Sequence, residues 1–437
     1  MNWFNFFRLA SHCLKSFGRG INADIRKDEE LLFDKAYKAF AEKKVLDAYE
    51  YFFNSLTNYT NEVSNQNIIL SREKEILKFT IFQGSAKING FCTRDKLYAE
   101  VIMISIQNTN VALKRYILER NYHFTYVNYC SDTQYIKLKL NLDNIMMTPQ
   151  KIFYPLRELA LNADFDKEHM LSEFEQDELE DAKHLKKVSS AELQVKHKFL
   201  HKWINKLEEE ISLLPSDDSI GMQSFLYLNL FFQIDYLIVP KCKIYQQLTK
   251  QLQDYFSETD MLPEVKNAEL VKYITELKEL SFDEFCSNFY DAEYTFSQIE
   301  KSPYEEFVTF IDDSLTKIRW YKNNRHSQII PTIYSYIALY ALYNYGLNPT
   351  ARKLLHIYIT VIYADFFTAL ECFGMYETEK NQFLKKDIIS QIETTISQDS
   401  KRYKLLKAFG DTLDFSSLND FSNSYFTALK NLNFHEA

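Results

Sequence analysis

The sequence predicts an α+β protein in two parts: a domain with a five-stranded antiparallel sheet and helices, followed by an all-α helical domain. Glycine and proline are scarce, at 8 each in 437 residues, whereas all-β and Rossmann-type proteins need more glycines for turns and phosphate loops. Strand-like alternation is confined to residues 77–142, and helical periodicity dominates elsewhere. Hydrophobic residues make up 46% of the chain, which is ample for buried cores.

Residues 1–20 are expected to form an amphipathic helix that ends at the glycines Gly18 and Gly20. The segment has neither the basic start nor the cleavage site of a signal peptide. Its apolar face either docks on the chain's own core or anchors the protein to a membrane surface or a partner. The residues that would form this anchor are Trp3, Phe6, Phe7, Leu14 and Phe17.

A helical hairpin is predicted over residues 24–60. Small residues such as Ala36 and Ala48 sit beside aromatic ones, and the segment resembles a single tetratricopeptide-type hairpin. Lys43 or Lys44 stands where that pattern has a turn glycine. A single hairpin cannot bury its own apolar face, so it is expected to pack on a neighbouring element.

Residues 61–170 are expected to form the sheet domain. Short segments of even spacing, with Gly84 at the first turn, are typical of an antiparallel meander. One helix, "NVALKRYILERN", separates three strands from a further pair, and a second helix begins at Thr148 and Pro149. The predicted strands cover residues 77–83, 86–93, 97–106, 123–131 and 134–142.

This order of helix, three strands, helix, two strands and helix resembles the CesT-like chaperones of type III secretion and the YbjN-like proteins that share their fold. The resemblance covers about residues 45–170 and rests also on "FTIFQGSAKINGF" and "FYPLRELALNAD". It implies a bacterial protein whose sheet domain holds a segment of a client protein. It also implies that a homodimer is one arrangement to test.

An antiparallel sheet can cover one face with helices and leave the other for a partner, and its edge can accept a peptide strand. In the first strand, Phe79 and Ile81 face one side and Thr80 and Phe82 the other, and either side could be the core. For each candidate residue, the alternative to binding a partner is packing in the core of the domain. The candidate partner-binding residues are Phe79, Ile81, Ile88, Phe91, Tyr98 and Val101.

Residues 171–190 are dense in charge and are expected to form a linker or a solvated helix. Residues 191–437 show only helical patterns, with Pro303, Pro331 and Pro349 at helix starts. The uncharged stretch 327–351 is expected to be a buried core helix, because too few residues separate Pro331 from a helix stop to span a bilayer.

Signatures of catalysis are absent from the sequence, which has no GxxxxGK[ST], GxGxxG, HExxH or GxSxG motif. His197 and His201 have the spacing of a bidentate metal clip, but a third ligand is not evident. No metal or other cofactor is therefore expected. The carboxylates Asp164, Asp166 and Glu168 are expected to be solvated charges after a helix.

The charge balance and the cysteines limit the function further. The net charge is −9 and no long Lys/Arg run occurs, so a nucleic-acid partner is not expected. The six cysteines form no CxxC pair and no disulfide framework, which predicts free thiols in a reducing cytoplasm.

These observations predict a cytoplasmic, non-enzymatic protein–protein interaction module, either chaperone-like or a scaffold or adaptor, that binds a partner protein or peptide through its sheet domain. One alternative is a protein peripheral to the inner membrane, anchored by the aromatic N-terminal helix. A second alternative is an enzyme with a site in the helical domain.

Overall fold

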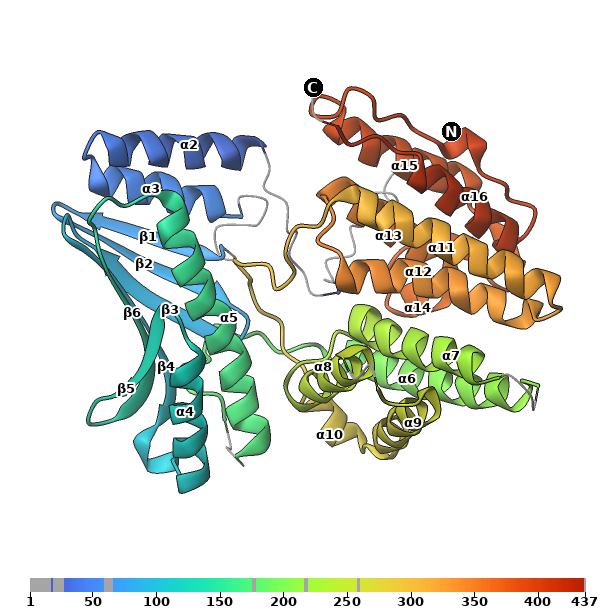
Figure 1. The fold of residues 1–437 in the computed structure, drawn as a ribbon, viewed down its shortest axis with the longest axis horizontal. Coiled ribbons are helices and arrows are strands. Elements are labelled where there is room, and N and C mark those ends of the chain that lie inside the picture. Colours follow the sequence, from blue (N-terminus) through green and yellow to red (C-terminus); the bar gives the residue numbers. More distant parts are fainter. Residues whose placement is uncertain are drawn as a thin grey trace.

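The computed structural model describes residues 17–18, 27–58, 66–174, 178–215, 219–257 and 260–435. It has two lobes, a sheet lobe and a helical lobe, that lie side by side in Figure 1. The prediction of an α+β chain with an antiparallel sheet and a helical part is confirmed. Trp3, Phe6, Phe7 and Leu14 lie outside the described residues.

The sheet has six strands instead of the five predicted, in the order β1-β2-β3-β4-β6-β5, and every neighbouring pair is antiparallel. The missed strand is β1, which a two-residue connection, Lys74 and Glu75, joins to β2. Neither residue has a positive φ, so the hairpin lacks the Gly or Asn that marks such turns in a sequence. The strands are β1 Ile68–Glu73, β2 Ile76–Gln83, β3 Ala86–Cys92, β4 Lys96–Ser105, β5 Val127–Ser131 and β6 Tyr135–Asp143.

Helices cover one face of this sheet (Figure 1). The predicted hairpin forms α2 and α3, and Lys43 adopts the left-handed φ of 60° where a glycine was expected. Apolar strand residues such as Leu77, Ile88 and Leu138 alternate inward to meet α3 and α5, which explains why one strand face is buried. These helices are α2 Lys27–Ala41, α3 Val45–Leu56, α4 Val111–His123 and α5 Pro149–Glu173, and the short 3-10 helix η2 Ile106–Asn108 precedes α4.

The helical lobe has its own core, and α12 is buried along most of its length, as expected for the uncharged stretch. Over the described ranges, none of the helices combines the length and apolarity needed to cross a membrane. The helices are α6 Ser190–Ser212, α7 Ile220–Gln233, the π-helix η3 Ile234–Ile238, α8 Cys242–Ser257, α9 Pro263–Glu279, α10 Phe282–Cys286, α11 Tyr304–Asn323, η4 Ser327–Ile329, α12 Ile330–Asn344, α13 Pro349–Ile362, α14 Ala364–Ala369, α15 Lys385–Asp399, η5 Gly410–Thr412 and α16 Leu418–Lys430. A two-stranded ribbon, β7 Tyr376–Glu377 with β8 Gln382–Phe383, was not predicted.

Residues 288–300, which we call the crossing segment, leave the helical lobe after α10 and return to the sheet lobe. Phe296 is 1% exposed and belongs to the core of the sheet lobe. The buried Gln83 side chain accepts hydrogen bonds from the backbone N–H groups of Thr295 (3.0 Å) and Phe296 (2.8 Å). The helical part of the sequence therefore completes the core of the sheet lobe.

The charged segment after α5 packs on the protein along its described part. Lys186 pairs with Asp291 of the crossing segment through two backbone hydrogen bonds, of 2.9 and 2.8 Å. The His184 ring stacks on Phe82, and its Nε2 lies 3.1 Å from the backbone oxygen of Gly84. Residues 178–189 thus behave as a strap across the end of β2 and β3 instead of a solvated linker.

The expectation of free thiols holds for Cys92, Cys130, Cys242 and Cys286. It is wrong for Cys372, which is disulfide-bonded. Tertiary approach sets such a bond, and the sequence spacing did not show it.

Candidate binding surface and lobe junction

The second face of the sheet, which we call the open face, lies opposite α3, α4 and α5 (Figure 1). Side chains that alternate with the buried set point to it, and most are half-buried. The strap reaches only its end, at Phe82 and Lys87. The open face includes Lys78, Thr80, Phe82, Lys87, Asn89, Phe91, Lys96, Tyr98, Glu100, Ile102, Lys137, Lys139, Asn141 and Asp143 on the inner strands β2, β3, β4 and β6.

An aromatic pair lies on the two middle strands of the open face, beside the turn that joins β3 to β4. Phe91 of β3 is directly opposite Tyr98 of β4, and their ring centroids are 5.4 Å apart. The Lys96 Nζ lies 5.7 Å from the Phe91 ring centre, and the Lys139 Nζ lies 6.0 Å from that of Tyr98. Cations over aromatic rings keep both the charge and the apolar ring edge available at a surface.

Glu100 lies beside this pair and orders the lysines around it. Its carboxylate accepts hydrogen bonds from the Tyr98 hydroxyl (2.6 Å) and the Lys137 Nζ (3.0 Å), and it lies 3.8 Å from the Lys139 Nζ. Burial opposes its charge, but these hydrogen bonds outweigh burial and lower the pKa of Glu100. On the inner strands, the open face carries five lysines and two carboxylates, Glu100 and Asp143, and Asp143 lies directly opposite Lys96. Three of the lysines also pair with acidic residues outside the inner strands: Lys78 with Glu73, Lys87 with Asp181 and Lys137 with Asp132.

The structure separates the six candidate partner-binding residues into two groups. Phe91 and Tyr98 lie on the open face and are half-buried. The other four are at most 3% exposed and pack in the core, where the Phe79 ring lies 4.5 Å from that of Phe53 in α3. These core residues, Phe79, Ile81, Ile88 and Val101, cannot contact a partner docked on the surface.

The two edges of the sheet differ. At the β5 edge, the Asn121 side chain of α4 accepts the Tyr129 N–H (2.6 Å) and donates to the Tyr129 oxygen (3.4 Å). It therefore occupies the backbone groups that a further strand would use. Along the described chain, β1 pairs only with β2. The β1 edge is thus the side of the sheet where another strand could add.

Phe17 belongs to the predicted anchor and is the member of it that the structure describes. It is half-buried against the helical lobe, with its ring 5.5 Å from that of His356 and 4.9 Å from that of Phe367. For this residue, the position fits the alternative in which the apolar face docks on the chain's own core.

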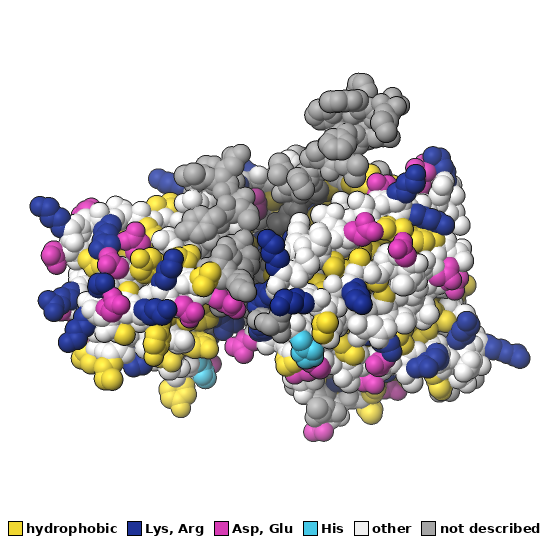
Figure 2. Space-filling model, turned by 90° about the horizontal axis from the view of Figure 1, so that it is seen from above, with side chains coloured by type: hydrophobic (Ala, Val, Ile, Leu, Met, Phe, Trp, Pro, Cys, Tyr) yellow, Lys and Arg dark blue, Asp and Glu magenta, His cyan; other side chains and the backbone are white. Residues whose placement is uncertain are grey.

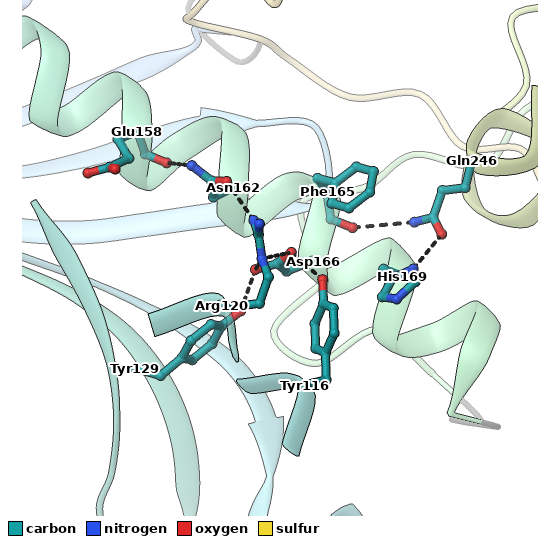
Figure 3. Close-up of polar contacts among 9 residues, drawn as sticks. All are labelled: Tyr116, Arg120, Tyr129, Glu158, Asn162, Phe165, Asp166, His169 and Gln246. Atoms are coloured by element: carbon teal, nitrogen blue, oxygen red, sulfur yellow. Dashed lines mark hydrogen bonds and ion pairs between the residues drawn. The ribbon is translucent and has the colours of Figure 1, made fainter. Parts of the chain in front are cut away.

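Three acidic residues of α5 were expected to be solvated, and this expectation is wrong. Asp166 is 0% exposed and accepts hydrogen bonds from the Tyr116 and Tyr129 hydroxyls, each 2.7 Å, and from the Arg120 Nε at 3.0 Å (Figure 3). Asn162 accepts a further 2.6 Å hydrogen bond from Arg120. The carboxylate joins α4, β5 and α5, and its partners 37 to 50 residues away in sequence explain why local reasoning missed it.

The same helix joins the two lobes through His169. The His169 Nδ1 lies 3.1 Å from the Gln246 Oε1 of α8, and the Gln246 amide donates to the Phe165 oxygen at 3.3 Å (Figure 3). The His169 ring is stacked against Phe165, with centroids 5.8 Å apart. These contacts form one side of the lobe junction.

Asp164 and Glu168, one helical turn apart on α5, lie deeper in the junction. Asp164 accepts the Ser85 N–H (2.7 Å) and hydroxyl (2.9 Å), and Glu168 accepts the Cys242 N–H (3.0 Å) and the Tyr290 hydroxyl. Burial raises the pKa of Asp164 to about 6. Burial and the neighbouring Asp164 charge raise the pKa of Glu168 to about 7.

A cavity of about 40 Å³ adjoins this carboxylate pair. Carboxylates with raised pKa values can act as general acids, but a cavity of this size holds a water-sized molecule and not an organic substrate. The hydrogen bonds of the pair to Ser85, Cys242 and Tyr290 join α5 to both lobes. The lining includes Asp164, Glu168, Asp235, Lys241 and Tyr294.

The helical lobe carries a larger depression, of about 540 Å³, between the segment 405–412 and α16. Its lining contains amide and hydroxyl side chains and Lys407, without a carboxylate, histidine or cysteine to serve as a nucleophile or base. Across the described ranges, His, Cys, Asp and Glu residues form no group of three or more that could hold a metal ion. No protein-family model and no curated protein matches the chain.

Proposed function

We propose that the chain is a protein-interaction module that binds an acidic, extended segment of a partner protein on the open face of its sheet. The observation that carries the proposal is the Phe91–Tyr98 pair, flanked by Lys96 and Lys139, on a sheet face opposite the covering helices. Buried aromatic anchors with charged neighbours are the usual energetic centre of a protein interface.

Charge favours an acidic partner. The inner strands of the open face carry five lysines against Glu100 and Asp143, although the whole chain carries a net charge of −9. On the face in Figure 2, by contrast, basic and acidic side chains of the described residues are interspersed over both lobes and form no continuous patch of one sign. Complementary charge steers a partner to one surface and discourages docking elsewhere.

Site-specific photo-crosslinking in the native cell tests this proposal. A benzophenone side chain at position 98 is expected to capture one specific partner, whereas the same group at Tyr122, which is 86% exposed on α4, is not. An acidic peptide from the captured partner should then bind the full chain. Tyr98→Ala and Lys139→Gln should each weaken that binding about tenfold, and added salt should weaken it further.

Equal capture at positions 98 and 122, or unchanged peptide affinity in both variants, would contradict the proposal. Recovery of a second copy of this chain from position 98 would instead identify the open face as a homodimer interface. Flotation of the protein with anionic vesicles that requires residues 1–16 would support the membrane-surface alternative.

A further inference from the structure

We propose that His197 and His201 of α6 chelate one divalent late first-row transition metal ion, such as Ni²⁺ or Zn²⁺. The two residues are four apart on one helix, and their Nε2 atoms lie 3.1 Å from each other. Both side chains are half-buried, so an ion from solvent can reach them. The sequence shows only the spacing, whereas the structure shows that the two rings bring their Nε2 atoms next to each other.

The separation of the two nitrogens fits chelation. With metal–nitrogen bonds of about 2.05 Å, a distance of 3.1 Å between the nitrogens corresponds to a nitrogen–metal–nitrogen angle of about 100°. This angle lies between the octahedral and tetrahedral values. Without an ion, one Nε2–H donates to the other nitrogen, so binding moves this proton to Nδ1 and presents two lone pairs to the ion.

The surroundings hold the rings in place. The His197 ring packs edge-on against Phe282 and Phe285 of α10, with centroids 5.3 and 5.0 Å away. A ring that packing already orders loses less conformational entropy on binding.

The charges near the pair do not prevent binding of a cation. Lys278 of α9 opposes an approaching ion, but its Nζ lies 2.7 Å from a carboxylate oxygen of Glu208, which offsets its charge. Lys202 of α6 lies 2.5 Å from Asp365. Because the described residues supply no third protein ligand, water completes the coordination, and we expect micromolar rather than tight binding.

Isothermal titration of the full chain with NiCl₂ at pH 7.5 tests the proposal. One saturable site is expected, and the ion should raise the melting temperature because it binds the folded chain. His197→Ala and His201→Gln should each lower the affinity at least about tenfold, because one ligand alone loses the advantage of chelation. His123→Ala, which removes an exposed histidine from α4, should bind like the wild type.

Unchanged Ni²⁺ affinity in both His197→Ala and His201→Gln would overturn the proposal. Loss of binding in Cys286→Ser would also overturn it, since that thiol lies on α10, which packs on α6. If His197→Ala does not fold, electron paramagnetic resonance of the Cu²⁺-loaded wild type and His201→Gln decides. Coupling of Cu²⁺ to two nitrogens in the wild type and to one nitrogen in His201→Gln supports the site. Equal coupling in the two proteins excludes it.

Discussion

Gly84 connects β2 to β3 and meets the lobe junction directly. It has a φ of +53°, and a Cβ added there would lie 2.3 Å from the Asp164 Oδ1. Its N–H donates to the Glu293 oxygen at 3.0 Å. The turn itself could be predicted from the sequence, because a glycine between two alternating runs marks a hairpin. The close approach to Asp164 could not, because it depends on a helix eighty residues later.

Gly84→Ala is expected to destabilise the protein. The left-handed backbone costs about 1–2 kcal/mol in a residue with a side chain, and the contact with Asp164 adds to this. Gly221→Ala is the matched control, because that glycine lies in the first turn of α7 and only Tyr321 comes within 3.9 Å of an added Cβ. Thermal unfolding should show a clear loss for Gly84→Ala and none for Gly221→Ala, and equal melting temperatures would contradict the argument.

Glu168 is expected to make stability fall as the pH rises. The pKa values of Asp164 (about 6) and Glu168 (about 7) are raised, so the native state binds more protons than the unfolded state between about pH 4 and pH 7. The stability that the protonated Asp164 and Glu168 side chains contribute is fully present below about pH 4, and it is lost as the pH rises through 6 and 7. Glu168→Gln, which cannot titrate, should therefore gain in melting temperature relative to the wild type from pH 5 to pH 8.

The exposed Glu269 of α9 provides the control, since Glu269→Gln should follow the wild-type profile over the same range. A Glu168→Gln profile parallel to that of the wild type would show that Glu168 does not titrate in this window. Neither partner of Glu168, the Cys242 N–H or the Tyr290 hydroxyl, is near it in sequence. Because these partners are distant in sequence, the sequence alone predicted that the carboxylates are solvated.

At the scale of elements, the strands that could be predicted are those whose alternation is strong and local. β6 alternates Ile136, Leu138 and Leu140 with lysines, and it forms where expected. β1 was missed because its three apolar residues are consecutive at positions 68–70 and the other three are polar, so the strand shows no alternation. Which face is open could not be predicted, because it depends on where α3 and α5 pack.

Gln83→Leu tests how the crossing segment is held on β2. The substitution removes the acceptor of the Thr295 N–H, which is partly buried, and of the Phe296 N–H, which is buried. Each donor left without an acceptor lowers the free energy of unfolding by about 1–3 kcal/mol. We expect a melting temperature several degrees lower and faster proteolysis within 288–300. Gln134→Leu, at an exposed position, should change neither the melting temperature nor the proteolysis. If residues 288–300 resist proteolysis in Gln83→Leu as they do in the wild type, packing of Phe296 alone is enough to hold the crossing segment.

For the whole molecule, the two predicted domains are not independent. The boundary near residue 190 follows a change in sequence pattern, but the sheet lobe takes Phe296 from the helical part into its core. The Gly84 N–H and Gln83 side chain also bind the crossing segment. Sequence patterns identify elements, whereas an exchange of this kind depends on long-range packing that leaves no periodic signal.

A fragment of residues 27–189 should therefore be less stable than the same lobe in the full chain. It retains the sheet and its helices but leaves a Phe-sized void and the unpaired Gln83, and loss of a buried Phe costs about 3–5 kcal/mol. A synthetic peptide of residues 288–300 should bind the fragment and raise its melting temperature in a saturable way, measured by circular dichroism. The same peptide with Phe296→Ala should have little effect. A fragment that melts as high as the full chain, and that neither peptide stabilises, would mean that the sheet lobe folds without help from the helical lobe.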